Sequence, residues 1–257
     1  MFSIYHIIWL AICVAVMIAA IIYLKKQRPQ LKDVLTVACI VSIASELIKV
    51  FSTIQMVPSS DGTMMYPYLE VQHLPLHLCS LQILVIFYVR FSSNDKLRDK
   101  LLAFMYPTCT IGAVLALMMT SIFNATIEVT QAFTHPLAYQ YFLFHTMLLL
   151  LGIYIPMSGE VKLDWKHYRS TMAILAVLGF LSIYINSLLA KATYVSGVLQ
   201  SVDYTPNFFF TYKFPIGIVF TEIWHWYIYI AVIAVAAAAV IGLMYLPFCR
   251  KKTANKY

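Results

Sequence analysis

The sequence predicts an all-α membrane protein, a bundle of about seven transmembrane helices. Of its 257 residues, 61% are hydrophobic and only 11% are charged, whereas about a quarter of a soluble domain is charged. Its mean hydropathy is +0.79. The apolar residues come in runs of about 20, the length that crosses roughly 30 Å of hydrocarbon. Because no linker separates two folding units, we expect one polytopic domain over residues 1–257.

The expected spans follow the apolar runs along the chain. No small-residue cleavage site follows the first run, so we expect a retained helix rather than a signal peptide. The last run contains AVIAVAAAAVIG (231–242), whose small residues favour close helix packing. The seven spans are expected at 4–24, 34–54, 73–91, 101–122, 139–157, 170–190 and 216–246.

Lysine and arginine are unevenly distributed among the connections. The segments after the first, third, fifth and seventh spans contain 15 of the 18 basic residues; Lys49, Lys191 and Lys213 are the exceptions. The positive-inside rule therefore predicts the N-terminus outside and the C-terminus in the cytoplasm. The net charge of +7 reflects this asymmetry and attraction to anionic headgroups. No basic stripe is interleaved with stacking aromatics, so we expect no nucleic-acid partner.

Polar and ionisable residues gather in the outer halves of the expected spans. Such residues are rare within membranes, and they mark functional sites. In the predicted orientation they occupy one layer, which predicts a polar cavity open toward the outer leaflet. These residues are Glu46, Lys49, His73, His77, Cys79, His145, Asn186, Glu222 and His225.

The stretch HLPLHLCS (73–80) is the densest part of this layer. A thiol becomes a nucleophile when a base takes its proton, and an imidazole can do so. On a helix, His77 and Cys79 would lie about 200° apart, so a histidine from another helix suits Cys79 better. His145 is expected at the same depth in the membrane as Cys79, six residues into its span. Pro75 suits a first helical turn, although it would also allow an irregular start that turns His77 toward the site.

Structural interpretations compete with the functional ones. Glu46 and Lys49 share a helix face and can neutralise one another. His73 can be an interfacial histidine, and His225, within EIWHWY, can belong to an aromatic belt. The remaining cysteines have no framework spacing, so we expect small apolar fillers without disulfides; they are Cys13, Cys39, Cys109 and Cys249.

With the string LPLHLC at 74–79, the sequence resembles the YwaF-like family of bacterial integral membrane proteins, which includes the animal transmembrane protein 164. Other parts agree in order, over roughly residues 40–230: ELIK at 46–49, YFLFHTMLLLLGIYI at 141–155, Asn186, and PNFFFTYKFP at 206–215. Two positions depart from the pattern. Ser80 stands where bacterial members often have Asp or Asn, and Phe208 stands where Tyr is common.

This resemblance implies an acyltransferase that acts on phospholipids. It implies that Cys79 takes the acyl chain as a thioester, that His145 is the base, and that a lysophospholipid accepts the chain. Membrane phospholipids and lysophospholipids are then the partners, no cofactor or metal is expected, and the location is the cell membrane, in a bacterium the plasma membrane. His77, Asn186 or Asn207 would donate hydrogen bonds to the oxyanion, and Glu46 would orient a histidine.

Two alternatives remain open at this stage. The His/Cys set formed by His73, His77, Cys79 and His145 contains ligand types for zinc or copper, and His-x3-His on a helix is a metal spacing, which would suit a metal transporter or sensor. The second alternative is a non-catalytic membrane protein that binds lipid or a small molecule. Such a protein would keep its function without Cys79. The sequence specifies neither the oligomeric state nor the acyl chain and headgroup.

Overall fold

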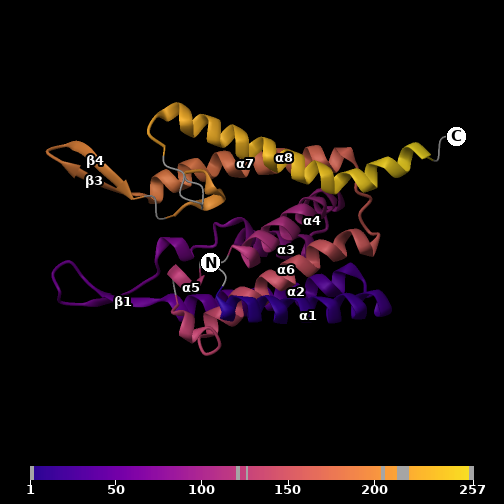
Figure 1. Cartoon of the computed structure of the whole chain (residues 1–257), viewed down its shortest axis with the longest axis horizontal. Helices are drawn as coiled ribbons and strands as arrows, with labels where there is room; N and C mark the ends of the chain where they lie inside the picture. The colour runs from indigo at the N-terminus through magenta and orange to yellow at the C-terminus, as the bar shows by residue number, and fades with distance from the viewer. Residues whose placement is uncertain (1–2, 120–121, 126, 204–205, 213–219, 255–257) are drawn as a thin grey trace. The chain divides into compact units, whose positions relative to one another are not determined.

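The structure, a computed structural model, describes residues 3–119, 122–125, 127–203, 206–212 and 220–254 (Figure 1). It is mostly helical. Its contacts divide the chain into two compact units: the first contains Met1–Leu69 and Cys79–Lys162, and the second contains Glu70–Leu78 and Leu163–Tyr257.

Six helices in the described part of the chain are long and apolar enough to cross a membrane, so this is a multi-pass membrane protein. Six of the seven predicted spans correspond to them, with shifted ends. The helices are Ile4–Gln27 (α1), Leu31–Thr53 (α2), Asp95–Met118 (α4), Pro136–Ser158 (α6), Trp165–Leu189 (α7) and Ile223–Ala254 (α8). Helix α4 begins earlier than predicted because the Asn94 side chain accepts a hydrogen bond from Leu97 N at 3.1 Å and caps it. The predicted start of the last span, at 216–219, lies outside the described residues.

The third predicted span, 73–91, is wrong in its first part. Only Leu78–Phe91 (α3) is helical, about 21 Å at 1.5 Å per residue, which is less than the roughly 30 Å of hydrocarbon. A short 3-10 turn, η1 (Val71–His73), precedes it, and Leu74 is extended, with ψ 146°. The physical reason is Pro75, since a proline disfavours the helical conformation of the residue before it. The irregular start is therefore the alternative that the structure adopts.

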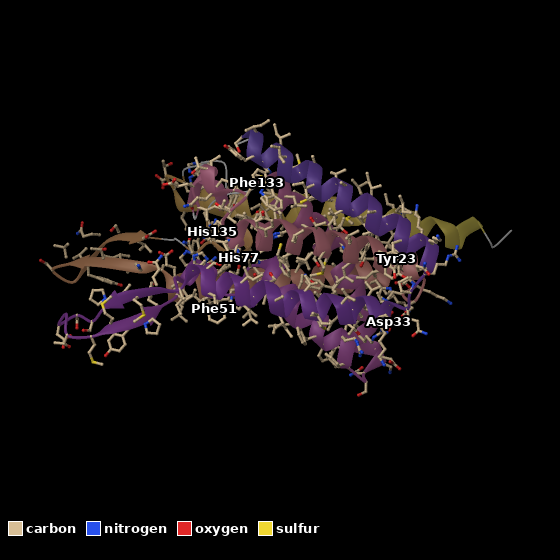
Figure 2. The ribbon with its side chains drawn as sticks, turned by 90° about the horizontal axis from the view of Figure 1, so that it is seen from below. Tyr23, Asp33, Phe51, His77, Phe133 and His135 are labelled. Carbon is tan, nitrogen blue, oxygen red and sulfur yellow. The ribbon has the colours of Figure 1, made fainter. Side chains whose placement is uncertain are left out.

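Helix α6 is the central helix of the first unit and packs against α1, α2 and α4. Trp9 of α1 stacks on Phe142 of α6 with ring centroids 4.8 Å apart. Tyr23 and Asp33 mark the connected ends of α1 and α2, and Phe51 lies at the far end of α2 (Figure 2). Because α6 is covered by α1, α2 and α4, most of its surface is buried and its polar side chains pack against these helices.

Gly152 of α6 allows α4 to approach closely. A Cβ at this position would lie 2.9 Å from the backbone N of Thr110 and 3.1 Å from the carbonyl O of Tyr106. Because the backbone of α4 would have to move, Gly152→Ala is expected to lower the free energy of unfolding by about 1–3 kcal/mol. Thermal unfolding in detergent measures this change. Gly179→Ala in α7 is the matched control, because a Cβ there has no atom within 4 Å; equal unfolding temperatures for both variants would contradict the packing.

Two connections form antiparallel hairpins that an all-α prediction does not include. Strand β1 (Gln55–Pro58) pairs with β2 (Met65–Tyr68), and β3 (Lys191–Val195) pairs with β4 (Val198–Asp203). The second hairpin turns through Ser196 and Gly197, which have φ of 51° and 79°. Positive φ at both central residues is typical of two-residue hairpin loops. In the first hairpin, hydrogen bonds from Ser59 and then Thr63 lower the pKa of Asp61 to about 2.

In the second unit, α7 and α8 run side by side (Figure 1). The Tyr168 hydroxyl donates to the Ala238 carbonyl at 3.3 Å, and its ring lies against Gly242. Thr171 and Tyr245 share a buried hydroxyl contact at 3.1 Å. The small residues of the Ala-rich run thus give the α7 side chains access to the α8 backbone.

Candidate functional site

The sequence-predicted site residues are divided between the two units. The first unit contains Glu46, Lys49, Cys79 and His145, and the second contains His73, His77, Asn186, Asn207, Glu222 and His225.

Cys79 lies in the first turn of α3 and faces α4. A Cβ built on Gly112 would lie 3.4 Å from its sulfur, so the missing side chain of this glycine leaves room for the thiol. One turn later, the Gln82 amide donates to the Thr108 hydroxyl at 3.0 Å. Cys79 as a residue is partly exposed, whereas Cys109 beside it is buried. The α3–α4 pair therefore fixes the position of the Cys79 sulfur.

His145 is buried on α6, with 8% of its surface exposed. Its Nδ1 lies 2.6 Å from the Tyr141 carbonyl one turn earlier. A carbonyl oxygen only accepts hydrogen bonds, so in the neutral ring Nδ1 carries the proton and Nε2 is the nitrogen that can accept one. The Tyr141 ring packs on the imidazole with centroids 4.4 Å apart. These contacts give His145 the tautomer of a base.

Cys79 and Tyr141, which precedes His145 by one helical turn, both contact one segment of α4, residues 112–116. The Cys79 sulfur lies against Gly112. The Tyr141 hydroxyl donates to the Ala116 carbonyl at 2.7 Å, and His145 follows Tyr141 by one helical turn. Since Gly112 and Ala116 are themselves one turn apart, the thiol and the tyrosine that packs on the imidazole contact the same part of α4.

Glu46 and Lys49 of α2 form an ion pair, with Lys49 Nζ 2.7 Å from Glu46 Oε1. This is the mutual neutralisation that their spacing allows. The neighbouring Ser45 hydroxyl accepts a hydrogen bond from Gln140 of α6 at 2.7 Å. The pair thus lies beside the helix that carries His145, while the carboxylate itself is engaged by the lysine.

In the second unit, Asn186 of α7 holds a sharp turn, η3 (Phe208–Phe210). The fully buried amide donates to the Phe208 carbonyl at 3.0 Å and to the Thr211 hydroxyl at 2.9 Å, and it accepts from Phe208 N at 2.9 Å. Phe209 and Phe210 have φ of 58° and 54°, a conformation that costs energy for a residue with a side chain. Asn186 therefore acts on the backbone, with both amide hydrogens already donated.

Aromatic side chains complete the support of this turn. The Trp226 indole donates to the Thr211 carbonyl at 2.8 Å, and the Tyr229 hydroxyl donates to the Phe210 carbonyl at 2.5 Å. The Asn207 side chain accepts from Tyr212 N at 3.0 Å. His77 meets the ring of Phe208 edge-on, with centroids 4.7 Å apart. The motif histidine thus belongs to the cluster that Asn186 organises.

The other predicted residues of this unit lie at element ends. His225 Nδ1 accepts from Glu222 N at 3.3 Å and contacts the Thr221 hydroxyl at 3.2 Å, so His225 closes the first turn of α8. Trp224 packs on its ring. Glu222 is exposed, and His73 ends η1.

Comparison with known proteins identifies the family. The model of the TMEM164 family matches residues 1–245. The chain belongs to the TMEM164 family. No curated protein and no solved structure matches it. The family predicted from LPLHLC is thereby confirmed, and the match extends beyond the residues on which the resemblance was based.

The metal-site alternative has no geometric support in the described part of this TMEM164 protein. No group of three or more His, Cys, Asp and Glu side chains there could hold a metal ion. The His-x3-His spacing would place both histidines on one face only within a continuous helix. His73 ends a 3-10 turn and His77 precedes α3, so the two residues do not share such a helix.

Gln82 is not among the residues predicted from the sequence, although it lies on the same side of α3 as Cys79. Gln82 is fully buried, and among the described residues its Oε1 has no hydrogen-bond partner. A buried polar atom without a partner costs about 1–3 kcal/mol. Its position three residues after the motif cysteine, on the same helix face, is the sequence feature that could have indicated it.

Proposed function

We propose that this TMEM164 protein is a phospholipid acyltransferase that works through a thioester on Cys79. One observation carries the proposal: the Cys79 thiol lies against the same segment of α4 that Tyr141 contacts, and Tyr141 packs on the imidazole of His145, which has the tautomer of a base. Both belong to one compact unit. A cysteine with a histidine as its base is an established arrangement for acyl transfer.

In the first half-reaction, His145 Nε2 takes the thiol proton and the Cys79 sulfur attacks the ester carbonyl of a phospholipid. A carbon–sulfur bond forms and the ester carbon–oxygen bond breaks. His145 returns the proton to the leaving oxygen, which yields a lysophospholipid and an acylated Cys79.

In the second half-reaction, His145 takes the proton of an acceptor hydroxyl on a lysophospholipid. The acceptor oxygen attacks the thioester, the carbon–sulfur bond breaks, and the proton returns to the Cys79 sulfur. One ester replaces another, so the cycle needs no cofactor.

The secondary roles and the setting belong to the same proposal. Glu46 and Lys49 are charged neighbours of the helix that carries His145, and the oxyanion roles expected of His77 and Asn207 stay predictions. The N-terminus is outside and the C-terminus is cytoplasmic, so Cys79 works toward the outer leaflet of a cell membrane. Membrane phospholipids and lysophospholipids are donor and acceptor.

Acyl exchange in proteoliposomes tests this function. The full chain is reconstituted with a phospholipid that carries one deuterated acyl chain and a lysophospholipid with a different headgroup, and the lipids are separated by mass spectrometry. We expect deuterium in a new diacyl lipid with the acceptor's headgroup, which protein-free liposomes do not form. Lipid that stays bound to the protein while all deuterium remains in the donor would instead indicate a binding protein.

A further inference from the structure

A pocket of about 330 Å³ lies in the first unit at the other end of α3 from Cys79. Eleven residues separate Cys79 from Arg90, about 16 Å along the helix, so the pocket is separate from the proposed acyl-transfer site. Its lining consists of Lys32, Arg90, Phe91, Ser92, Ser93, Asp95 and Arg98. Three basic side chains face one acidic one, so the lining is cationic.

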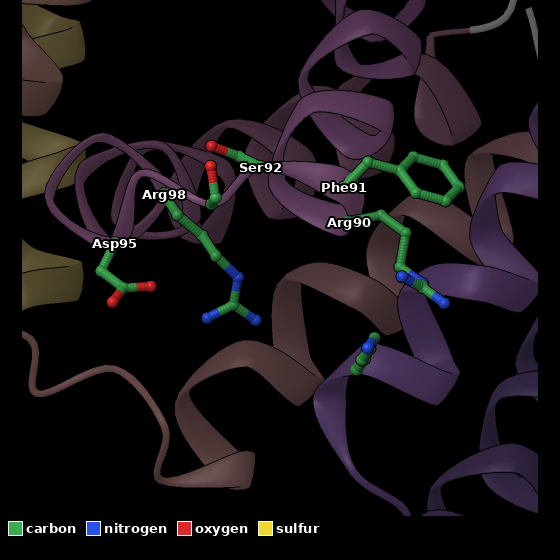
Figure 3. A pocket seen from close by; sticks show the side chains of 7 residues that line it. Arg90, Phe91, Ser92, Asp95 and Arg98 are labelled. Atoms are coloured by element: carbon green, nitrogen blue, oxygen red, sulfur yellow. The ribbon is translucent and has the colours of Figure 1, made fainter.

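The cations come from three helices and are held in place. Arg90 Nε donates to the Thr36 hydroxyl at 2.6 Å, and Arg98 Nε donates to the Val89 carbonyl at 3.0 Å. Figure 3 shows the Arg90 and Arg98 side chains reaching into the same space from α3 and from α4. Their main-chain and hydroxyl partners fix one nitrogen of each guanidinium group. Terminal nitrogens of both groups remain to bind an anion, and of these Nη2 of Arg98 also lies near Glu160.

The negative groups nearby compensate these charges only in part. Glu160 Oε2 lies 3.5 Å from Arg98 Nη2, and Oε1 of Glu160 accepts from Leu31 N at 2.8 Å. Asp95 is in the first turn of α4, where an acidic side chain stabilises the helix. The Lys32 ammonium is exposed and has no hydrogen-bond or ion-pair partner among the described residues.

The chemistry of the lining matches a phosphate group. A guanidinium presents a planar fork that matches two phosphate oxygens, a lysine adds a mobile charge, and a helix N-terminus favours anions. The Ser92 hydroxyl accepts from Asn94 N at 3.0 Å and keeps its own hydrogen to donate. We propose that this pocket binds the phosphate of a lipid headgroup or of a free phosphate ester.

The test uses the full chain in two arms. In neutral detergent, inorganic phosphate is titrated and thermal unfolding is followed. In phosphatidylcholine nanodiscs with or without phosphatidic acid, bound lipid is counted by native mass spectrometry. Binding in the nanodisc arm alone assigns a lipid headgroup, binding in the detergent arm alone assigns a free phosphate ester, and binding in both assigns the phosphate group itself.

Lys32→Gln is the decisive variant, because no described partner of its ammonium is lost and folding should be unaffected. We expect this variant to bind phosphate or phosphatidic acid about tenfold more weakly, because it loses one charge-assisted contact. Arg90→Lys keeps the charge without the fork and should also weaken binding. Arg169→Gln, an exposed arginine of α7, removes the same charge elsewhere and should bind as the wild type does. Absence of binding in both arms, or equal binding by the wild type and Lys32→Gln, would overturn the proposal.

Discussion

Cys79→Ala is expected to abolish acyl exchange in proteoliposomes, with a loss of at least about a thousandfold. The thiol is the only group of the protein that bonds covalently to the acyl chain in the proposed cycle, and removal of a nucleophile leaves only the contribution of binding and positioning. The rate of appearance of deuterated product measures the effect. His145→Gln should lower the same rate by roughly a hundredfold or more, the contribution typical of a general base.

Cys109→Ala is the matched control for the nucleophile. Cys109 is a neighbouring thiol, but it is buried on α4 with 1% exposure. Its replacement removes a sulfur of the same size without removing the proposed acyl acceptor, so exchange should persist. Equal loss in both variants would indicate a packing role for the pair, and full activity of Cys79→Ala would exclude the thioester.

Asn186→Leu should disorder the turn over residues 206–212. Leucine is close to asparagine in size, yet it leaves the buried Phe208 N–H without its partner, while the Phe208 C=O keeps Thr211 as a donor. An unsatisfied buried group costs about 1–3 kcal/mol, so a loss of that size is expected. Hydrogen exchange followed by mass spectrometry should show faster exchange at Phe208, whose amide is otherwise protected.

Ser187→Ala provides the comparison, because Ser187 is the next residue of α7 and is exposed. Its exchange profile should match that of the wild type. Unchanged protection of Phe208 in Asn186→Leu would show that Trp226 and Tyr229 hold the turn without the asparagine.

Much of the helical architecture could be predicted from the sequence, because apolar runs of about 20 residues define spans almost alone. The start of the third span could not, since the hydropathy of 73–77 is compatible with a helix. The conformation there depends on Pro75 and its effect on Leu74. The hairpin at 191–203 had a local sequence signal in the Ser196–Gly197 pair. In the structure both residues adopt the positive φ values that suit a tight turn.

For the candidate site, sequence reasoning could identify the residue types but not their partners. The spacing of Glu46 and Lys49 was sufficient to predict their ion pair. The role of Asn186 depends on Phe208, 22 residues away, and such a contact has no periodic signal. The Gln82 amide oxygen, which has no partner among the described residues, is likewise a property of tertiary packing, because its amide nitrogen is bound by Thr108 of α4.

Intact mass spectrometry of the purified protein after incubation with one defined phospholipid tests the central claim most directly. The account predicts a mass gain equal to one acyl chain, removed by hydroxylamine, present in the wild type and in Cys109→Ala and absent from Cys79→Ala. His145→Gln should acquire the adduct much more slowly. An adduct that survives in Cys79→Ala, or no adduct in a wild-type protein that does exchange acyl chains, would contradict a thioester on Cys79.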